Sequence, residues 1–137
     1  MTTALYAGLL AFLFIGLSAR VIRGRMLHAV ALGDGGNDDL MRRIRSQANF
    51  VEYTPLFLIL LALAEYQDLP APAVHALGSL YLVGRISHAY GVGIKERIIK
   101  RRLYHRVYRF SGMICTFCAI GFTALILIAQ YLAQVGG

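Results

Sequence analysis

Two charged side chains interrupt long apolar stretches of this sequence. Glu52 is the only acid within Arg45–Leu63, and Arg85 is the only formal charge within Ala73–Ile94. If these stretches cross a membrane, each charge is costly in lipid unless it is paired or faces a polar cavity. Because the charges are opposite in sign, they predict either a buried ion pair between neighbouring helices or a polar pocket for a charged ligand.

Glu52 belongs to a stripe of polar residues. On a helix that turns about 100° per residue, one sector roughly 100° wide holds Glu52 together with Arg45, Asn49 and Tyr53. Gln47 points to nearly the opposite side of the same helix. A cation, an amide, a carboxylate and a phenol therefore share one face of an otherwise apolar helix.

A second polar face surrounds Arg85. Tyr81 precedes it by four residues and His88 follows it by three, so all three share one face of a helix. Arg20 closes the first apolar stretch and is expected at the same membrane depth. A single ion pair does not need so many polar neighbours. Their number favours a pocket for a small, polar, multiply anionic ligand.

The composition predicts the elements that would position these residues. Of 137 residues, 58% are apolar and only 15% are charged, against about 25% charged in a soluble domain. The mean hydropathy is +0.60. We expect one all-α domain over residues 1–137, an integral membrane four-helix bundle. Its predicted spans are residues 3–23, 46–66, 73–94 and 108–133, each close to the ~20 residues that cross a bilayer.

The cations predict the orientation of the bundle. All 14 Lys and Arg lie in Arg20–Arg45, at Arg85 or in Lys95–Arg109. The positive-inside rule then places the first and third loops in the cytoplasm and both termini outside. The same rule accounts for the net charge of +7, so no nucleic-acid partner is expected. Membrane lipid is the expected surrounding.

The polar stripe also carries a resemblance. The run Arg45-Ser-Gln-Ala-Asn-Phe-Val-Glu-Tyr-Thr-Pro55 resembles the second-helix motif of the MAPEG family, the membrane-associated proteins of eicosanoid and glutathione metabolism. Gly84-Arg-Ile-Ser-His88 resembles the third-helix motif of this family, and Ser18-Ala-Arg20 the end of its first helix. Short bacterial members with a GDGG loop look most similar, so a bacterial inner membrane is the expected location.

This resemblance implies a homotrimer that binds glutathione between subunits near the cytoplasmic side. The pocket would be lined by residues of the second and third helices: Arg45, Asn49, Glu52, Tyr53, Arg85 and His88. Arg20 and Gln47 would reach it from the neighbouring subunit. Glu52 would hold the ammonium of the tripeptide, and the arginines its carboxylates.

The resemblance further implies an arginine that activates the thiol. A free thiol has a pKa of about 8.5 and reacts as the thiolate, which a nearby guanidinium favours. Arg109 is the first choice and Arg106 the alternative, because the segment after His88 is longer than in the animal enzymes. Val92 stands where the family has an aromatic residue.

The expected function is glutathione-dependent conjugation of a lipophilic electrophile, or reduction of a lipophilic peroxide. Two alternatives remain: a non-catalytic membrane protein that binds glutathione or lipid, and a small-molecule transporter that uses Glu52 as its coupling carboxylate. Glutathione would be a co-substrate. No metal is expected, because ligand-type residues are not clustered, and Cys115 and Cys118 fit an apolar helix rather than a thioredoxin-like motif.

Overall fold

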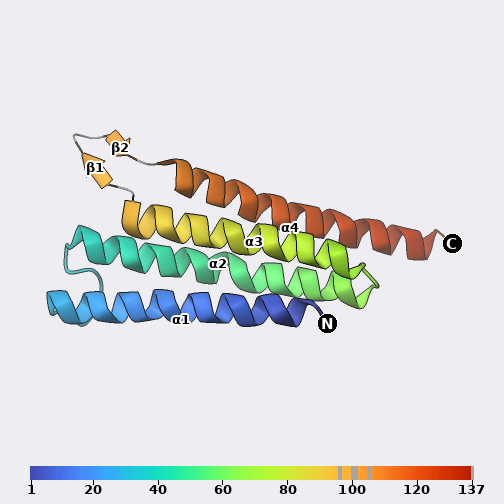
Figure 1. The fold of residues 1–137 in the computed structure, drawn as a ribbon, viewed down its shortest axis with the longest axis horizontal. Helices are drawn as coiled ribbons and strands as arrows, with labels where there is room; N and C mark the ends of the chain where they lie inside the picture. Colours follow the sequence, from blue (N-terminus) through green and yellow to red (C-terminus); the bar gives the residue numbers. More distant parts are fainter. Residues whose placement is uncertain (96, 100–101, 105, 137) are drawn as a thin grey trace.

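Four long helices lie side by side in one bundle. The computed structural model describes residues 1–95, 97–99, 102–104 and 106–136. The helices are α1 (Thr3–His28), α2 (Asp38–Tyr66), α3 (Ala71–Tyr90) and α4 (Arg106–Val135), and Figure 1 shows them running along the longest axis of the molecule. The predicted all-helical membrane bundle is confirmed, and each helix overlaps its predicted range.

Three of the described helices are long and apolar enough to cross a membrane. They are Thr3–His28, Asp38–Tyr66 and Val107–Val135. α3 has 20 residues and is not among these three. At about 1.5 Å per residue it is still as long as the hydrocarbon core is thick. Its role as the fourth span therefore remains a prediction.

The first loop turns where the sequence predicts. Gly33, Gly35 and Gly36 have φ of 67°, 59° and 73°, a region that glycine adopts without steric cost. The side chain of Asn37 accepts a hydrogen bond from the backbone N–H of Leu40 at 3.0 Å and so caps the start of α2. α2 consequently begins some eight residues before the predicted span, at the loop itself.

The core lies where α1, α2 and α3 meet, and α4 adds Ala119 to it. It contains large apolar side chains, among them Leu10, Leu17, Phe50 and Leu61. Phe57 of α2 and Tyr81 of α3 stack with ring centroids 3.9 Å apart and an interplanar angle of 4°. The Tyr81 hydroxyl lies 3.1 Å from Thr54 Oγ1, so the polar end of this buried ring is hydrogen-bonded.

α3 and α4 approach most closely at two glycines. A Cβ on Gly112 would lie 2.5 Å from the backbone N of His88, and one on Gly84 would lie 2.8 Å from Cys115 Cβ. Real Cβ atoms are not found at such distances, so both positions require glycine. This close approach brings α4 against the part of α3 that carries Arg85.

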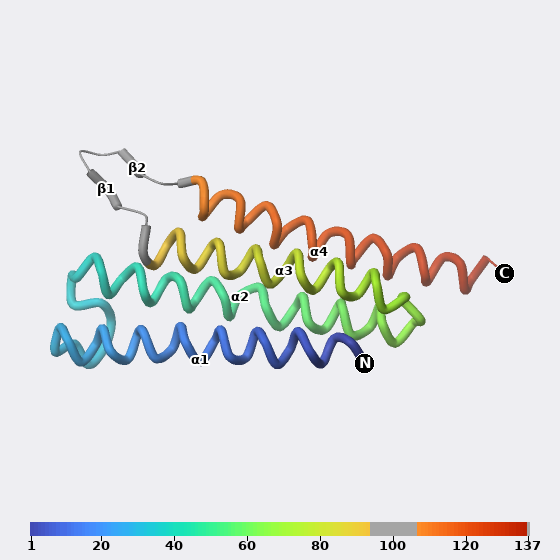
Figure 2. The backbone as a smooth tube through the Cα atoms, in the orientation of Figure 1, coloured from blue at the N-terminus to red at the C-terminus, as the bar shows by residue number. Residues whose placement is uncertain are grey.

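The segment between α3 and α4 contains elements that the sequence does not predict. A short π-helix, η1 (Gly91–Lys95), continues α3. Two three-residue strands, β1 (Arg97–Ile99) and β2 (Arg102–Tyr104), then pair antiparallel with Ile98 opposite Leu103. Figure 1 shows β1 and β2 at the end of the bundle where α1 and α2 are joined, and Figure 2 traces the four helices in the same orientation. The bundle thus carries a small β-hairpin on its cation-rich end.

Candidate functional site

Arg85 is the centre of the predicted polar region, and it is completely buried. Its Nη2 donates to Asn49 Oδ1 of α2 at 2.9 Å, and its Nη1 donates to Thr116 Oγ1 of α4 at 3.3 Å. The guanidinium carbon lies 5.8 Å from the ring centroid of Phe50 and 5.9 Å from that of Tyr53. Arg85 therefore links three helices through hydrogen bonds and aromatic faces.

Glu52 does not pair with Arg85 within the subunit. In the part of the chain that the structure describes, the ion pairs within 4.0 Å all involve Asp39, with His28, Arg42 and Arg43. Glu52 is exposed on the outer surface of α2. The simple ion-pair hypothesis is therefore wrong for the single subunit, because an amide and a hydroxyl, not a carboxylate, take the place of the expected partner.

The stripe on α2 divides into an inner and an outer part. Asn49 and Tyr53 are half-buried and lie against Arg85, and Tyr53 also meets Phe117 edge-on at 5.6 Å. Arg45 and Glu52 are exposed. The stripe thus runs from the buried guanidinium to the surface of the subunit.

Gln47 lies on a different side of α2, as helical periodicity predicts. Its Nε2 donates to Ser18 Oγ of α1 at 2.8 Å. Arg20 lies two residues further along α1, and its Nη2 donates to the Gly93 carbonyl of η1 at 2.9 Å. The structure thus places both residues between helices of their own subunit, away from Arg85.

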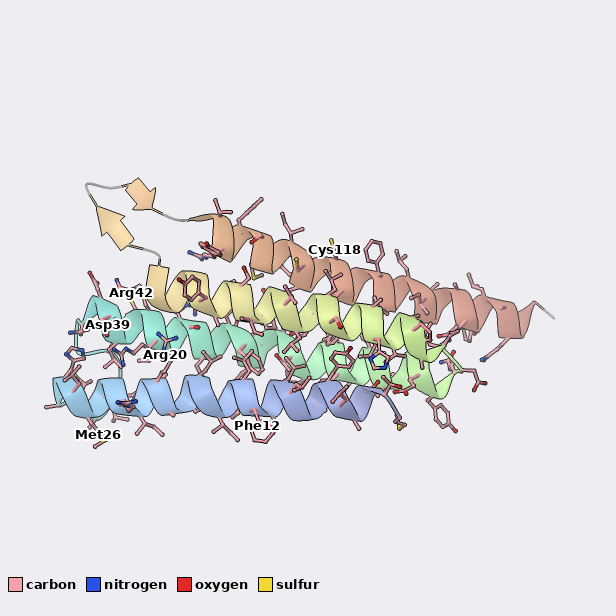
Figure 3. The ribbon with its side chains drawn as sticks, viewed as in Figure 1. Phe12, Arg20, Met26, Asp39, Arg42 and Cys118 are labelled. Atoms are coloured by element: carbon pink, nitrogen blue, oxygen red, sulfur yellow. The ribbon has the colours of Figure 1, made fainter. Side chains whose placement is uncertain are left out.

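Figure 3 shows where Arg20 lies relative to the ion pairs of Asp39. Arg20 rises from α1 towards the middle of the bundle, while Asp39 and Arg42 lie near the start of α2 at the same end. Arg43 connects the two regions, because it pairs with Asp39 at 2.8 Å and donates to the Arg20 carbonyl at 3.2 Å. This network fixes the end of α1 against α2.

His88 is buried within the contact between α3 and α4. It is 3% exposed, and its Nδ1 has no hydrogen-bond partner among the described residues. It lies on the same face of α3 as Tyr81 and Arg85, all three being buried as the spacing predicts. His88 is therefore a buried residue of α3, whereas Glu52 is exposed on α2.

The two candidate activating arginines lie at the start of α4. Arg109 is exposed, and its backbone N lies 2.7 Å from the position of a Cβ on Gly91, so the first turn of α4 packs tightly on η1. The side chain of Arg106 lies outside the described residues. Nearby, Tyr90 and Tyr108 meet edge-on with centroids 5.3 Å apart. The choice between Arg109 and Arg106 remains a prediction.

Thr116 is a site residue that sequence reasoning missed. It is fully buried, and its hydroxyl donates to the Gly112 carbonyl at 2.8 Å while it accepts from Arg85. A threonine in an apolar helix is ordinary, since its hydroxyl can bond the carbonyl four residues earlier. The available signal was its spacing of four from Gly112, the residue that brings α4 against α3.

Metal ligands do not gather in the described residues. No group of three or more His, Cys, Asp or Glu side chains is close enough there to hold an ion. Cys115 and Cys118 are free thiols, both half-buried in α4. Around the Arg85 guanidinium the structure gathers hydrogen-bond partners, not metal ligands.

The chain matches known membrane proteins over most of its length. The model of the MAPEG family matches residues 3–129. Inner membrane protein YecN of Escherichia coli strain K12 is 38% identical over 122 residues, covering 88% of this chain and 85% of YecN. The same protein of E. coli O6:H1 strain CFT073 matches equally. With its apolar helices and an inner-membrane relative, this is a membrane protein, and it belongs to the MAPEG family.

Proposed function

We propose that this protein is a glutathione-dependent membrane transferase, with peroxidase activity as the related reaction, and that glutathione binds where two subunits meet. Family membership supports the proposal. The observation that carries it is the position of Arg45 and Glu52, which are exposed on α2 although α2 is long and apolar enough to cross a membrane.

A charge on the lipid-facing surface of a spanning helix costs several kcal/mol, roughly 2.5–3.5 on insertion scales. Within the described residues Glu52 has no ion-pair partner, so its exposure needs an explanation. A second copy of the chain packed on this face would remove the charges from lipid and would create a closed polar site. We therefore propose a homotrimer with its sites between subunits.

Glutathione fits the charges of such a site. It carries one ammonium, two carboxylates and a thiol. The Glu52 carboxylate would accept hydrogen bonds from the ammonium, and the guanidinium of Arg45 would hold a carboxylate through its planar fork. Asn49 and Tyr53 would orient the peptide between these charges. Arg20 and Gln47, assigned by resemblance to the neighbouring site, bond within their own subunit in this structure.

The reaction needs the thiol of glutathione as its thiolate, on the side of the site that faces the bilayer. A guanidinium at the start of α4, that of Arg109 or Arg106, would favour the anion by its fixed positive charge. In conjugation the thiolate attacks the electrophile, forms the carbon–sulfur bond and displaces the leaving group. A lipophilic substrate would arrive from the bilayer, where it concentrates.

Turnover of glutathione tests this proposal. Detergent-purified protein should conjugate glutathione to a chlorodinitrobenzene, releasing chloride, and the product is read by absorbance. Glu52→Gln should abolish saturation by glutathione, while Asp38→Asn, an exposed acid four turns away on the same helix, should not. Glutathione binding without turnover would support a non-catalytic binder instead. Absence of binding together with proton-coupled uptake in proteoliposomes would support a transporter.

A further inference from the structure

A groove of about 320 Å³ opens between α1 and α3. It is lined by apolar side chains of both helices and by one cation: Phe12, Leu13, Leu17, Ile86, Tyr90 and Arg20. This volume is at the small end of the range for ligand sites. α2, which carries Glu52 and Arg45, does not line it. The groove therefore lies apart from the α2 part of the proposed glutathione site, and Arg20 is the one residue that the resemblance assigns to both.

Gly16 adjoins open space in the groove. A Cβ on Gly16 would meet nothing within 4 Å, and Gly16 is one of the lining residues. Gly16 therefore contributes only backbone to the lining, and Phe12 lies at the outer rim, where Figure 3 shows the ring pointing away from the bundle. An extended apolar chain could lie along the groove between the two helices.

Two arginines of α1 could meet a ligand in the groove, one that lines it and one that lies three residues further along the helix. Arg20 lines it, and among the described residues its guanidinium makes one hydrogen bond, to the Gly93 carbonyl. Arg23 is exposed and has no hydrogen bond or ion pair with any described residue. Three residues after Arg20, it falls in the same helical sector as Gly16. Both cations lie at the end of α1 that the positive-inside rule assigns to the cytoplasm.

We propose that this groove binds one anionic phospholipid of the cytoplasmic leaflet, with an acyl chain over Gly16 and the phosphate between Arg20 and Arg23. The positive charge of these two arginines is complementary to a phosphate, and the apolar lining suits an acyl chain. Basic pockets between membrane helices on the cytoplasmic side recognise anionic headgroups in this way. The remaining N–H groups of Arg20 and the fork of Arg23 donate to the phosphate oxygens.

Native mass spectrometry of the intact protein in mild detergent tests the assignment. Phosphatidylglycerol and phosphatidylcholine with identical acyl chains are added in turn. We expect phosphatidylglycerol to be retained at least tenfold more than phosphatidylcholine. Arg23→Gln should lower that retention several-fold. Arg25→Gln, on the opposite face of the same helix, should leave it unchanged.

The apolar part of the site has its own matched pair of variants. Gly16→Leu should fill the groove and reduce phosphatidylglycerol retention several-fold. Gly8→Leu should not, although its Cβ likewise meets nothing within 4 Å on α1. Glutathione affinity should stay unchanged in Arg23→Gln and Gly16→Leu, which separates this site from the proposed active site. Equal loss in Arg23→Gln and Arg25→Gln, equal retention of both lipids, or retention of free fatty acid alone would each overturn the proposal.

Discussion

Arg85 Nη2 donates to Asn49 Oδ1 at 2.9 Å, and this bond joins the buried guanidinium of α3 to the polar stripe of α2. The partner is a neutral amide rather than the nearby carboxylate. Arg85 therefore stays charged in the core through hydrogen bonds and aromatic faces, and Glu52 remains available at the surface of the subunit. The arrangement separates a structural cation from an acid that can meet a ligand.

The contact between Arg85 and Thr116 predicts a measurable loss of stability. Thr116→Val keeps the shape of the side chain but removes the acceptor for Nη1, and hydrogen bonds to charged groups contribute about 1.5–3 kcal/mol. The melting temperature in detergent should fall accordingly. Thr123→Val is the control, since Thr123 is equally buried and bonds only the Ala119 carbonyl. An equal fall in melting temperature in both variants would mean that the hydrogen bond from Arg85 to Thr116 adds nothing to stability.

The close approach of α3 and α4 gives a second stability prediction. Gly112→Ala would place a Cβ 2.5 Å from the His88 backbone N, so α4 must move, at a cost of about 1–3 kcal/mol for overpacking. Gly121→Ala on the same helix meets nothing within 4 Å and should be neutral or stabilising, because alanine favours the helix by up to about 1 kcal/mol. Thermal melting of both variants checks this; a stable Gly112→Ala protein would show that the helices are less closely packed.

Periodicity predicted the helices and their faces well. It placed Tyr81, Arg85 and His88 together, and all three are buried on one face of α3. It also placed Gln47 apart from the stripe, where it bonds Ser18. These features depend only on spacing within one helix, which the sequence contains directly.

Partners across helices could not be predicted in the same way. Charge alone suggested Glu52 for Arg85, yet the actual partners are Asn49 and Thr116. The choice of partner depends on how closely two helices approach. Gly112 and Gly84 allow the close approach of α3 and α4, but the spacing of residues along one helix does not reveal the distance to another. The β-hairpin in the basic segment was also missed, since six paired residues without apolar alternation resemble a loop.

Membrane orientation follows from the cations and can be measured by labelling. In a background without Cys115 and Cys118, cysteines are introduced at Leu32 and Tyr66, which are 89% and 83% exposed at opposite ends of the bundle. In intact cells, an impermeant maleimide should modify Tyr66→Cys only, and Leu32→Cys should react after permeabilisation. Modification of both positions from outside would contradict the predicted arrangement.

The activating arginine can be identified from the thiolate absorbance of bound glutathione. Arg109→Ala should leave binding nearly intact, lower kcat, and raise the pKa of the bound thiol towards its free value of about 8.5. Arg109→Lys should recover part of the effect, because an ammonium lacks the planar fork. If Arg106→Ala raises this pKa and Arg109→Ala does not, the assignment moves one turn along α4.

The affinity of the purified protein for glutathione, measured by titration calorimetry with its Glu52→Gln and Asp38→Asn variants, tests the central claim most directly. Native mass spectrometry of the same samples should show a trimer. We expect Glu52→Gln to weaken binding by roughly 2–4 kcal/mol, as for loss of one partner of a buried charged pair, and Asp38→Asn to bind as the wild type does. A folded Glu52→Gln protein with unchanged affinity, or a monomer that binds glutathione fully, would contradict a site completed by Glu52 between subunits.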